Sequence, residues 1–262
     1  MSDNDQMLTF GGHLEVLRRM LYRMLIVIAI IAITIFCFKE FIFEFLLAPS
    51  KCDFCLYRWI EKVLMLFGSD FHFAPFEVTL IATDLSSQFM THISTSFYLG
   101  ILGASPYIVF ELFRFASPAL YENERKYSIP IILVMYALFM AGVLMSYYIL
   151  FPISFRFLGT YSVAEQVHSA ITLDSYISTF MTLTLVMGVI FQLPVLAYFL
   201  AKLGIINGDL LASYRQYAFM IILITAAIIT PPDLMTMVLV TIPLYLLYEI
   251  SILVATKTCS NG

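Results

Sequence analysis

The densest run of charged residues in the chain lies between two long apolar runs, at residues 113–126. Glu122 and Glu124 carry carboxylates there, and Arg125 follows directly. Carboxylates pair with guanidinium groups through bidentate, charge-assisted hydrogen bonds, and Phe115 adds an aromatic surface that suits cations. The segment could therefore dock a peptide with adjacent arginines. A solvated loop that only sets membrane topology would have the same composition, and the residues alone leave both interpretations open.

A second charged segment precedes the first apolar run. Glu15, Arg18 and Arg19 lie within residues 12–23, where leucines recur at the helical spacing of positions 14, 17 and 21. This pattern predicts an amphipathic helix that continues directly into the apolar run. We expect this helix to form the other half of the docking surface.

The sequence contains no pattern typical of catalysis. HExxH, GxSxG and phosphate-binding loop motifs are all missing, so we predict that the chain is not an enzyme. The four histidines are scattered along the chain, and we predict no metal site and no cofactor. Cys52 and Cys55 form a CxxC pair that could be two thiols, a small disulfide or a metal site.

A few polar residues lie within or beside the apolar runs. Glu111, Gln192 and Glu249 fall inside them, and Asp233 lies between the last two. Such groups are costly in lipid and usually face protein or water. The two glutamates could pair with nearby basic residues, and Gln192 could bond across helices. Together they could also form a polar spot inside a concave helix assembly, which is the interpretation we favour.

Composition identifies the class of protein. The 262 residues are 61% hydrophobic and only 12% charged, whereas soluble domains have about 25% charged residues. The chain is therefore expected to be an integral membrane protein that faces the lipid bilayer. The net charge of −4 predicts no nucleic-acid partner.

The apolar runs predict an all-α protein with one membrane domain over residues 1–262. Pro194 should kink the fourth span, and Pro152 follows the end of the third. The fifth span is short, about 23 Å against a hydrocarbon core of about 30 Å. Residues 39–92 form a long outer connection that we expect to act as a cap. The six predicted spans are 20–38, 93–113, 129–151, 177–201, 216–230 and 234–255.

The distribution of basic residues predicts the orientation. With both termini inside, nine lysines and arginines lie on inner segments and five on outer ones, four of the five in the long first connection. Because inner segments of membrane proteins are enriched in these residues, we predict an N-in, C-in topology. The inner set is Arg18, Arg19, Arg23, Arg114, Arg125, Lys126, Lys202, Arg215 and Lys257, and the outer set is Lys39, Lys51, Arg58, Lys62 and Arg156.

Several short motifs in this order resemble the TatC family, the multi-spanning receptor subunits of the twin-arginine protein translocase. Each motif is weak alone, but the set covers nearly the whole chain. The motifs are His13-Leu14-x-x-Leu17-Arg18, Ile81-Ala82-Thr83-Asp84, Phe115-x-x-Pro118-Ala119-Leu120-Tyr121-x-x-Glu124-Arg125, Phe191-Gln192-x-Pro194-Val195, Thr230-Pro231-Pro232-Asp233 and Ile242-Pro243-x-x-x-Leu247-x-Glu249.

The resemblance implies a bacterial cytoplasmic (inner) membrane protein that binds twin-arginine signal peptides of folded export substrates. It implies single-span TatA/TatB-type partners, homo-multimers within the receptor complex, and transport driven by the proton-motive force. The six helices would form a concave, glove-like shape capped by the first outer loop. Glu124, Arg18 and Phe115 match recognition positions of the family, and the positions linked to fold or assembly are Pro49, Asp84, Pro106 and Asp233.

The sequence departs from the family pattern in three places. The N-terminal acid is Glu15, one position earlier than usual, which turns its side chain by about 100° on a helix. Gln192 replaces the usual glutamate of the fourth span. Met237 stands where many members carry a glutamine that could bond a partner helix, so this contact is expected to be remodelled.

We predict that Glu124, with Glu15 and Glu122, binds the arginine pair, and that Arg18 and Arg125 orient these acids. A function of another class is a small-solute or ion secondary transporter that uses Glu111, Glu249 and Asp233. Coupled flux through the purified protein would distinguish the transporter from the receptor.

Overall fold

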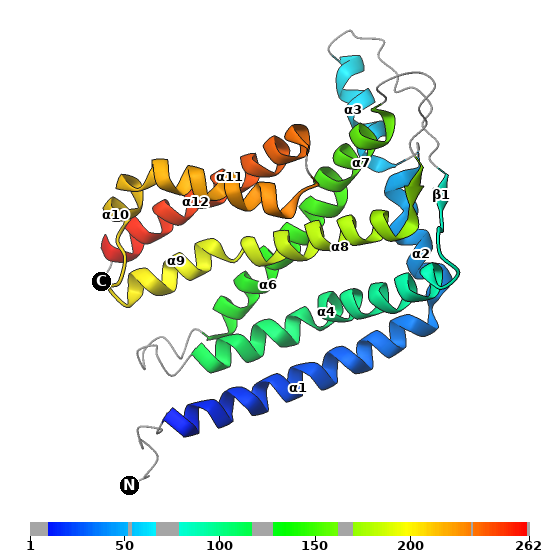
Figure 1. Cartoon of the computed structure of the whole chain (residues 1–262). Helices are drawn as coiled ribbons and strands as arrows, with labels where there is room; N and C mark the ends of the chain where they lie inside the picture. Colours follow the sequence, from blue (N-terminus) through cyan, green and yellow to red (C-terminus); the bar gives the residue numbers. More distant parts are fainter. Residues whose placement is uncertain are drawn as a thin grey trace. The chain divides into compact units, whose positions relative to one another are not determined.

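The computed structural model describes residues 10–51, 54–66, 79–116, 128–161, 170–231 and 233–260. These residues are almost entirely helical, as the apolar runs predict (Figure 1). Contacts divide the chain into two units, which we describe separately. The first consists of Met1–Phe38 and Ser96–Tyr136, and the second of Lys39–Thr95 and Ala137–Gly262.

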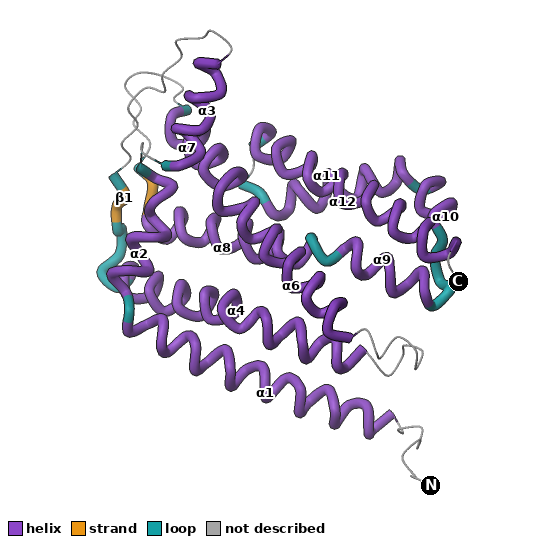
Figure 2. The backbone as a smooth tube through the Cα atoms, turned by 180° about the vertical axis from the view of Figure 1, so that it is seen from behind, coloured by secondary structure: helices purple, strands orange, loops and turns teal. Residues whose placement is uncertain are grey.

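The first unit contains α1 (Phe10–Cys37), most of α4 (Ser87–Ala116) and the first half of α6 (Ser128–Met145). The N-terminal charged segment and the first apolar run form one uninterrupted helix, α1. Helices α1 and α4 lie side by side in both views (Figures 1 and 2). In lipid, a helix satisfies its own backbone hydrogen bonds, which is why apolar runs of this length fold in this way.

Glycine allows α1 and α4 to approach closely. A Cβ atom added at Gly100 of α4 would lie 2.9 Å from the Cβ of Ala32 and 3.1 Å from the carbonyl oxygen of Ile28. Small residues commonly permit such contacts between membrane helices. The contact fixes the distance between the two helices that carry the predicted charged segments at their ends.

The second unit contains the remaining elements. Two of them follow α1 directly, and a third contains the chain's only tryptophan, Trp59. The helices are α2 (Lys39–Leu47), η1 (Ala48–Ser50), α3 (Cys55–Leu66), the π-helical turn η3 (Ser146–Leu150), α7 (Phe151–Thr160), α8 (Leu173–Ile190), α9 (Leu193–Lys202), α10 (Gly208–Ser213), α11 (Arg215–Ile229) and α12 (Leu234–Ser260).

The helix of the third apolar run continues beyond Pro152, where the sequence predicts its end. Helix α6 passes through η3 into α7, and Pro152 occupies the first turn of α7. Proline has no N–H to donate to the preceding turn, and the N–H of Phe151 just before it donates to the carbonyl of Ser146. The π-helical turn directly before it accommodates the change in register.

The fourth apolar run is divided near Pro194, as the sequence predicts. Helix α8 ends at Ile190, a turn covers Phe191 and Gln192, and α9 begins at Leu193 (Figure 2). Pro194 therefore lies in the first turn of a new helix. The run consists of two helices separated by a turn, with Gln192 in the turn.

A short parallel sheet connects two loops that the sequence predicts to be separate. Strand β1 (Leu80–Ile81) pairs with β2 (Ile171–Thr172), with Leu80 opposite Ile171 (Figure 2). The hydroxyl of Thr91 donates a hydrogen bond of 3.4 Å to Asp174 directly beyond this pair. The starts of α4 and α8 therefore lie together.

Buried tyrosines of the second unit donate hydrogen bonds to backbone carbonyls of other elements. The hydroxyl of Tyr147 donates to Phe45 at 2.9 Å, and that of Tyr176 donates to Leu46 at 2.8 Å. Tyr57 of α3 donates to the carbonyl of Pro152 at 2.8 Å. These bonds attach α2 and α3 to the long helices, because each buried hydroxyl needs a partner.

Among the described residues, five helical stretches are long and apolar enough to cross a membrane, and α11 is a shorter apolar helix of 15 residues. At 1.5 Å per residue, α11 reaches only about 23 Å. The described part of the chain is thus an all-α membrane protein, with one apolar helix shorter than the hydrocarbon core of about 30 Å. The five stretches are Leu14–Cys37, Ser87–Phe115, Ile129–Thr160, Leu173–Lys202 and Leu234–Cys259.

Candidate functional site

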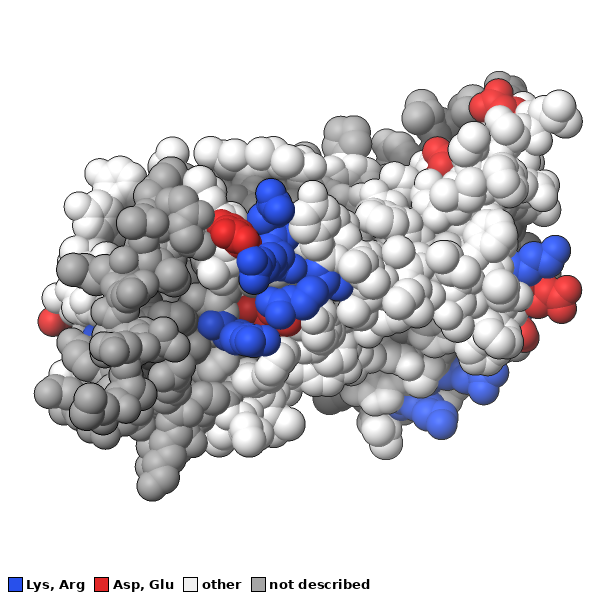
Figure 3. Space-filling view, turned by 90° about the horizontal axis from the view of Figure 1, so that it is seen from below, with Lys and Arg blue, Asp and Glu red and all other residues white. Residues whose placement is uncertain are grey.

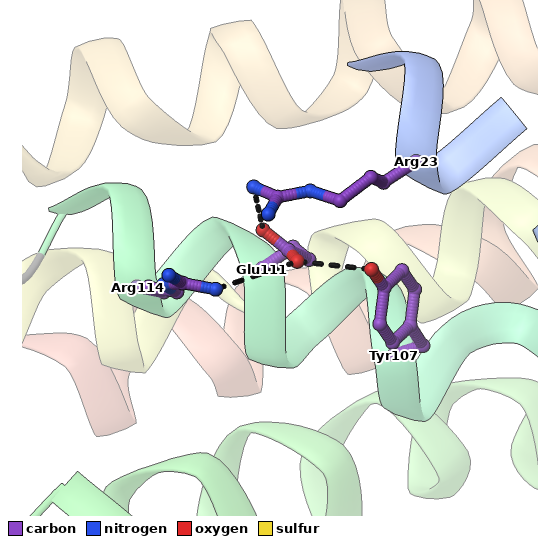
Figure 4. Close-up of polar contacts among 4 residues, drawn as sticks. All are labelled: Arg23, Tyr107, Glu111 and Arg114. Atoms are coloured by element: carbon purple, nitrogen blue, oxygen red, sulfur yellow. Dashed lines mark hydrogen bonds and ion pairs between the residues drawn. The ribbon is translucent and has the colours of Figure 1, made fainter. Parts of the chain in front are cut away.

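Glu111 of α4 is the centre of a polar cluster in the first unit (Figure 4). Its carboxylate accepts hydrogen bonds from Arg23 of α1 at 3.2 Å and from the hydroxyl of Tyr107 at 2.9 Å, and Arg114 lies 4.0 Å away. Glu111 is only 3% exposed, and it is the only charged residue among those described that is buried. Two hydrogen-bond donors and a second nearby guanidinium therefore compensate a carboxylate that is withdrawn from water.

Helical spacing brings these groups together. Tyr107, Glu111 and Arg114 follow one another at intervals of four and three residues, so they share one face of α4. On α1, Met20 and Met24 are buried, and Arg23, which lies between them on about the same side of the helix, reaches Glu111 of α4. The sequence predicts pairing with a nearby basic residue as one possibility for Glu111, but it does not identify Arg23 or Tyr107 as the partners.

The contacts between α1 and α4 define an antiparallel register. Arg23 meets Glu111, and Ile31 meets Gly103. Extending this register five residues toward the N-terminus brings Arg18 level with the last turn of α4, which contains Phe115. Two of the predicted recognition residues, from sequence segments almost 100 positions apart, are thus brought to the same end of one helix pair.

The side chains at this end are exposed and mostly basic. Arg19 forms an ion pair with Glu15 one helical turn earlier, and the Arg18 guanidinium lies 5.9 Å from the ring centre of Tyr22. Phe115 is 41% exposed. Figure 3 shows a central cluster of basic side chains with acidic ones beside it, and further basic side chains towards one edge. Within the described residues, Glu15 is thus paired with Arg19, whereas Arg18 packs on an aromatic ring.

The charged loop itself lies outside the described residues. It contains Glu122, Glu124 and Arg125, whose predicted roles remain predictions. The two flanking helices are described, because α4 ends at Ala116 and α6 begins at Ser128.

The second glutamate of the apolar runs, Glu249 of α12, pairs with Arg215 at the start of α11. Both carboxylate oxygens accept from the guanidinium at 2.9 Å. Gln192 is half-buried in the turn between α8 and α9. Glu249 and Gln192 therefore lie in different structural settings within the second unit.

The residues that the resemblance links to fold or assembly have diverse surroundings. Asp233 accepts a hydrogen bond of 2.6 Å from the backbone N–H of Thr236, which caps the start of α12. Met237 is half-buried one turn later. Pro49 is buried in η1, Asp84 is exposed before α4, and Pro106 lies exposed within α4. No three His, Cys, Asp or Glu side chains group as metal ligands in the described part of the chain.

Residues 12–243 match the family described as the Sec-independent protein translocase protein (TatC). The TatC protein of Blattabacterium sp. subsp. Periplaneta americana is 35% identical over 259 residues, which cover 97% of either chain. The TatC protein of Aquifex aeolicus is 35% identical over 244 residues, 91% of this chain and 92% of that protein.

Known structures agree with these relatives. A crystal structure described as the twin-arginine translocase receptor TatC has a TM-score of 0.75 and 34% identity, covering 94% of this chain and 99% of that one. The family match over residues 12–243 includes both charged segments. The chain therefore belongs to the TatC family of Sec-independent protein translocase proteins.

Proposed function

We propose that this chain is the receptor subunit that recognises twin-arginine signal peptides on folded proteins. The recognition surface consists of Glu15, Arg18 and Phe115 together with Glu122, Glu124 and Arg125 of the charged loop. One observation carries the proposal: the family match spans both charged segments, and the α1–α4 register brings the ends of their helices to one level.

The electrostatics explain why acids of the loop are needed. The ends of α1 and α4 carry Arg18, Arg19, Arg23 and Arg114, and Glu111 is already engaged. A peptide with two arginines would be repelled by such a patch unless further carboxylates faced it. Glu124 and Glu122 supply these carboxylates, and Arg125 orients them.

Glu15 contributes by exchanging partners. Its side chain is 56% exposed and its ion pair with Arg19 lies on the surface. Exposed pairs of this kind are worth only about 0.2–1 kcal/mol. An arginine of the peptide can therefore replace Arg19 at little cost, and tight binding requires several such contacts plus apolar docking.

The chain is a multi-pass protein of the bacterial cytoplasmic membrane and a subunit of the Tat translocase. We propose that it acts by binding rather than by catalysis, in multimers with TatA/TatB-type single-span subunits, and that the proton-motive force drives transport. The short helix α11 and the polar Gln192 would favour local thinning of the bilayer beside the apolar part of the signal peptide.

The alternative of a small-solute or ion transporter is not supported. The family is one of protein translocases, and the three acids assigned to such transport have structural partners. Glu111 and Glu249 are ion-paired and Asp233 caps α12.

A crosslinking experiment tests the receptor function directly. A photoreactive residue at position 124 should crosslink to a twin-arginine signal peptide, and the crosslink should disappear when both arginines of the peptide become lysine. The same residue at position 209, where an exposed aspartate lies on an inner segment of the predicted topology, serves as the control. Equal crosslinking of the two peptides at position 124 would overturn the recognition role.

Export provides the functional measurement. Glu124→Ala should abolish export of a twin-arginine substrate in cells while the chain still accumulates in the membrane. Asp209→Asn should export normally. Normal export by Glu124→Ala would contradict the proposal.

A further inference from the structure

A pocket of about 380 Å³ lies in the second unit, where α2, α4 and α8 begin. Its polar walls are Lys39, Glu40, Gln88 and His92, and the rings of Phe43 and Phe89 form part of its apolar side. We propose that this pocket, which we call the headgroup pocket, binds the headgroup of an aminophospholipid of the phosphatidylethanolamine type. It shares no residue with the recognition surface, so the two proposals stand independently.

The sheet of β1 and β2 brings the walls of the pocket together. The pairing of β1 with β2 places the residues before α4 beside those before α8, and the bond from Thr91 to Asp174 links the second turn of α4 to the first turn of α8. The ring of Phe43 then packs edge-on against His92, with ring centres 5.7 Å apart, which brings in α2. Three segments that are remote in sequence thus converge around one opening.

The headgroup pocket lies at the level where lipid headgroups are found. The apolar stretches of α4 and α8 begin at Ser87 and Leu173, so Gln88 and His92 fall in the first two turns of α4 and Leu173 begins α8. Phe89 is 57% exposed beside them and offers an apolar ring to acyl chains. A phospholipid at this depth would present its phosphate to the polar walls and its acyl chains to the aromatic side.

The charges of the walls match a zwitterion. Lys39 and Glu40 are adjacent and exposed, and neither has an ion-pair partner within the described residues. An ethanolamine phospholipid carries a phosphate for the lysine and an ammonium group for the carboxylate. A choline headgroup has no N–H to donate to Glu40, and a glycerol headgroup has no cation. The pair therefore distinguishes ethanolamine lipids by hydrogen bonding as well as by charge.

The single tryptophan makes this preference measurable. In a Trp59→Phe background, Phe89→Trp places a fluorescent reporter at the pocket. The purified full-length chain is reconstituted in vesicles in which either phosphatidylethanolamine or phosphatidylcholine carries brominated acyl chains that quench tryptophan. We expect the reporter to favour the ethanolamine lipid by about fivefold, the size expected for one good charged contact near a membrane surface.

The variants assign the preference to the two charges. Lys39→Gln and Glu40→Gln should each reduce the preference to about twofold or less. The matched controls Lys51→Gln and Glu44→Gln change exposed charges just outside the pocket and should keep it. A second reporter, Ile228→Trp on the exposed face of α11, should be quenched equally by both lipids and confirms that each variant is inserted.

Four results would overturn the proposal. The first is equal quenching of the Phe89→Trp reporter by the two lipids, and the second is no quenching by either, which would show that lipid does not enter. The third is a preference that survives in both Lys39→Gln and Glu40→Gln. Stronger quenching by brominated phosphatidylglycerol than by the ethanolamine lipid would instead assign the pocket to anionic lipids and would also reject it.

Discussion

Arg23 and Glu111 show how this chain tolerates a charge near the end of a membrane helix. The carboxylate of Glu111 is buried, while the Arg23 and Arg114 side chains remain 46% and 61% exposed. Buried charges are costly unless they are paired and hydrogen-bonded, and here Arg23 and Tyr107 donate hydrogen bonds while Arg114 adds a second positive charge. The arginines reach from the aqueous end of the helices, so their charged groups keep contact with water.

Removing the Glu111 carboxylate should weaken the first unit. We expect Glu111→Ala to reduce the free energy of unfolding by about 1–3 kcal/mol, because Tyr107 loses its acceptor and the arginines repel each other. Glu111→Gln should cost less, since it keeps a hydrogen-bond acceptor. Thermal unfolding in detergent micelles provides the measurement.

The other glutamate pair provides the control for this prediction. Glu249→Gln breaks an ion pair in which both side chains are about a third exposed or more, so we expect a loss of only about 0.2–1 kcal/mol. Wild-type unfolding by Glu111→Ala would show that the cluster contributes no net stability.

Polar side chains cap the starts of two helices in the second unit. Helix α12 begins after Pro231, and Asp233 accepts the N–H of Thr236 in its first turn. Asn207 does the same for α10 by accepting the N–H of Leu210 at 2.7 Å. Each cap satisfies a donor that the helix itself leaves free.

The role of Asp233 can be separated into hydrogen bonding and charge. Asp233→Ala should lower the free energy of unfolding by about 1 kcal/mol, because the cap is lost. Asp233→Asn retains an acceptor oxygen and should unfold like the wild type in the same thermal assay. If the asparagine variant is as unstable as the alanine variant, the carboxylate charge matters and the cap does not explain it.

At the scale of the whole molecule, the distribution of basic residues sets the orientation in the membrane. The predicted N-in, C-in topology places Cys259 inside and Cys55 outside, and both are exposed. The chain's own cysteines therefore serve as markers of the two sides.

The topology can be measured by labelling intact cells with a membrane-impermeant maleimide. A variant that keeps only Cys55 should react in intact cells, whereas one that keeps only Cys259 should react only after the membrane is opened. Labelling of both samples after lysis controls for reactivity. Reaction of the Cys259 variant in intact cells would reverse the predicted orientation.

Much of the fold could be predicted because the apolar runs are long. Their positions predict α11 within one residue and the stretch of α8 and α9 within four, whereas α1 begins ten residues before its predicted span and the helix of the third run continues nine residues beyond its own. Pro194 correctly indicates the division between α8 and α9. The end of α7 could not be predicted from Pro152, because a proline can either stop a helix or begin its next turn. Whether Lys39–Leu47 forms a helix depends on buried contacts such as that of Leu46 with Tyr176.

Contacts between remote segments could not be predicted from the sequence. Two-residue strands such as Leu80–Ile81 have no periodicity, and their pairing depends on the helices that follow. Arg23 and Glu111 are each visible as charges in apolar surroundings, but helical spacing relates residues only within one helix. Their pairing requires the register between α1 and α4, which close packing at Gly100 determines.

The parallel pair of β1 and β2 has a consequence for how the protein is made. Leu80 can pair with Ile171 only after 91 more residues have been synthesised. At a synthesis rate of about 5–20 residues per second, this corresponds to roughly 5–18 seconds between emergence of the two strands from the ribosome. The headgroup pocket cannot close before α8 has entered the membrane. A bound lipid would thus be acquired late in biogenesis, when most of the apolar helices are already in place.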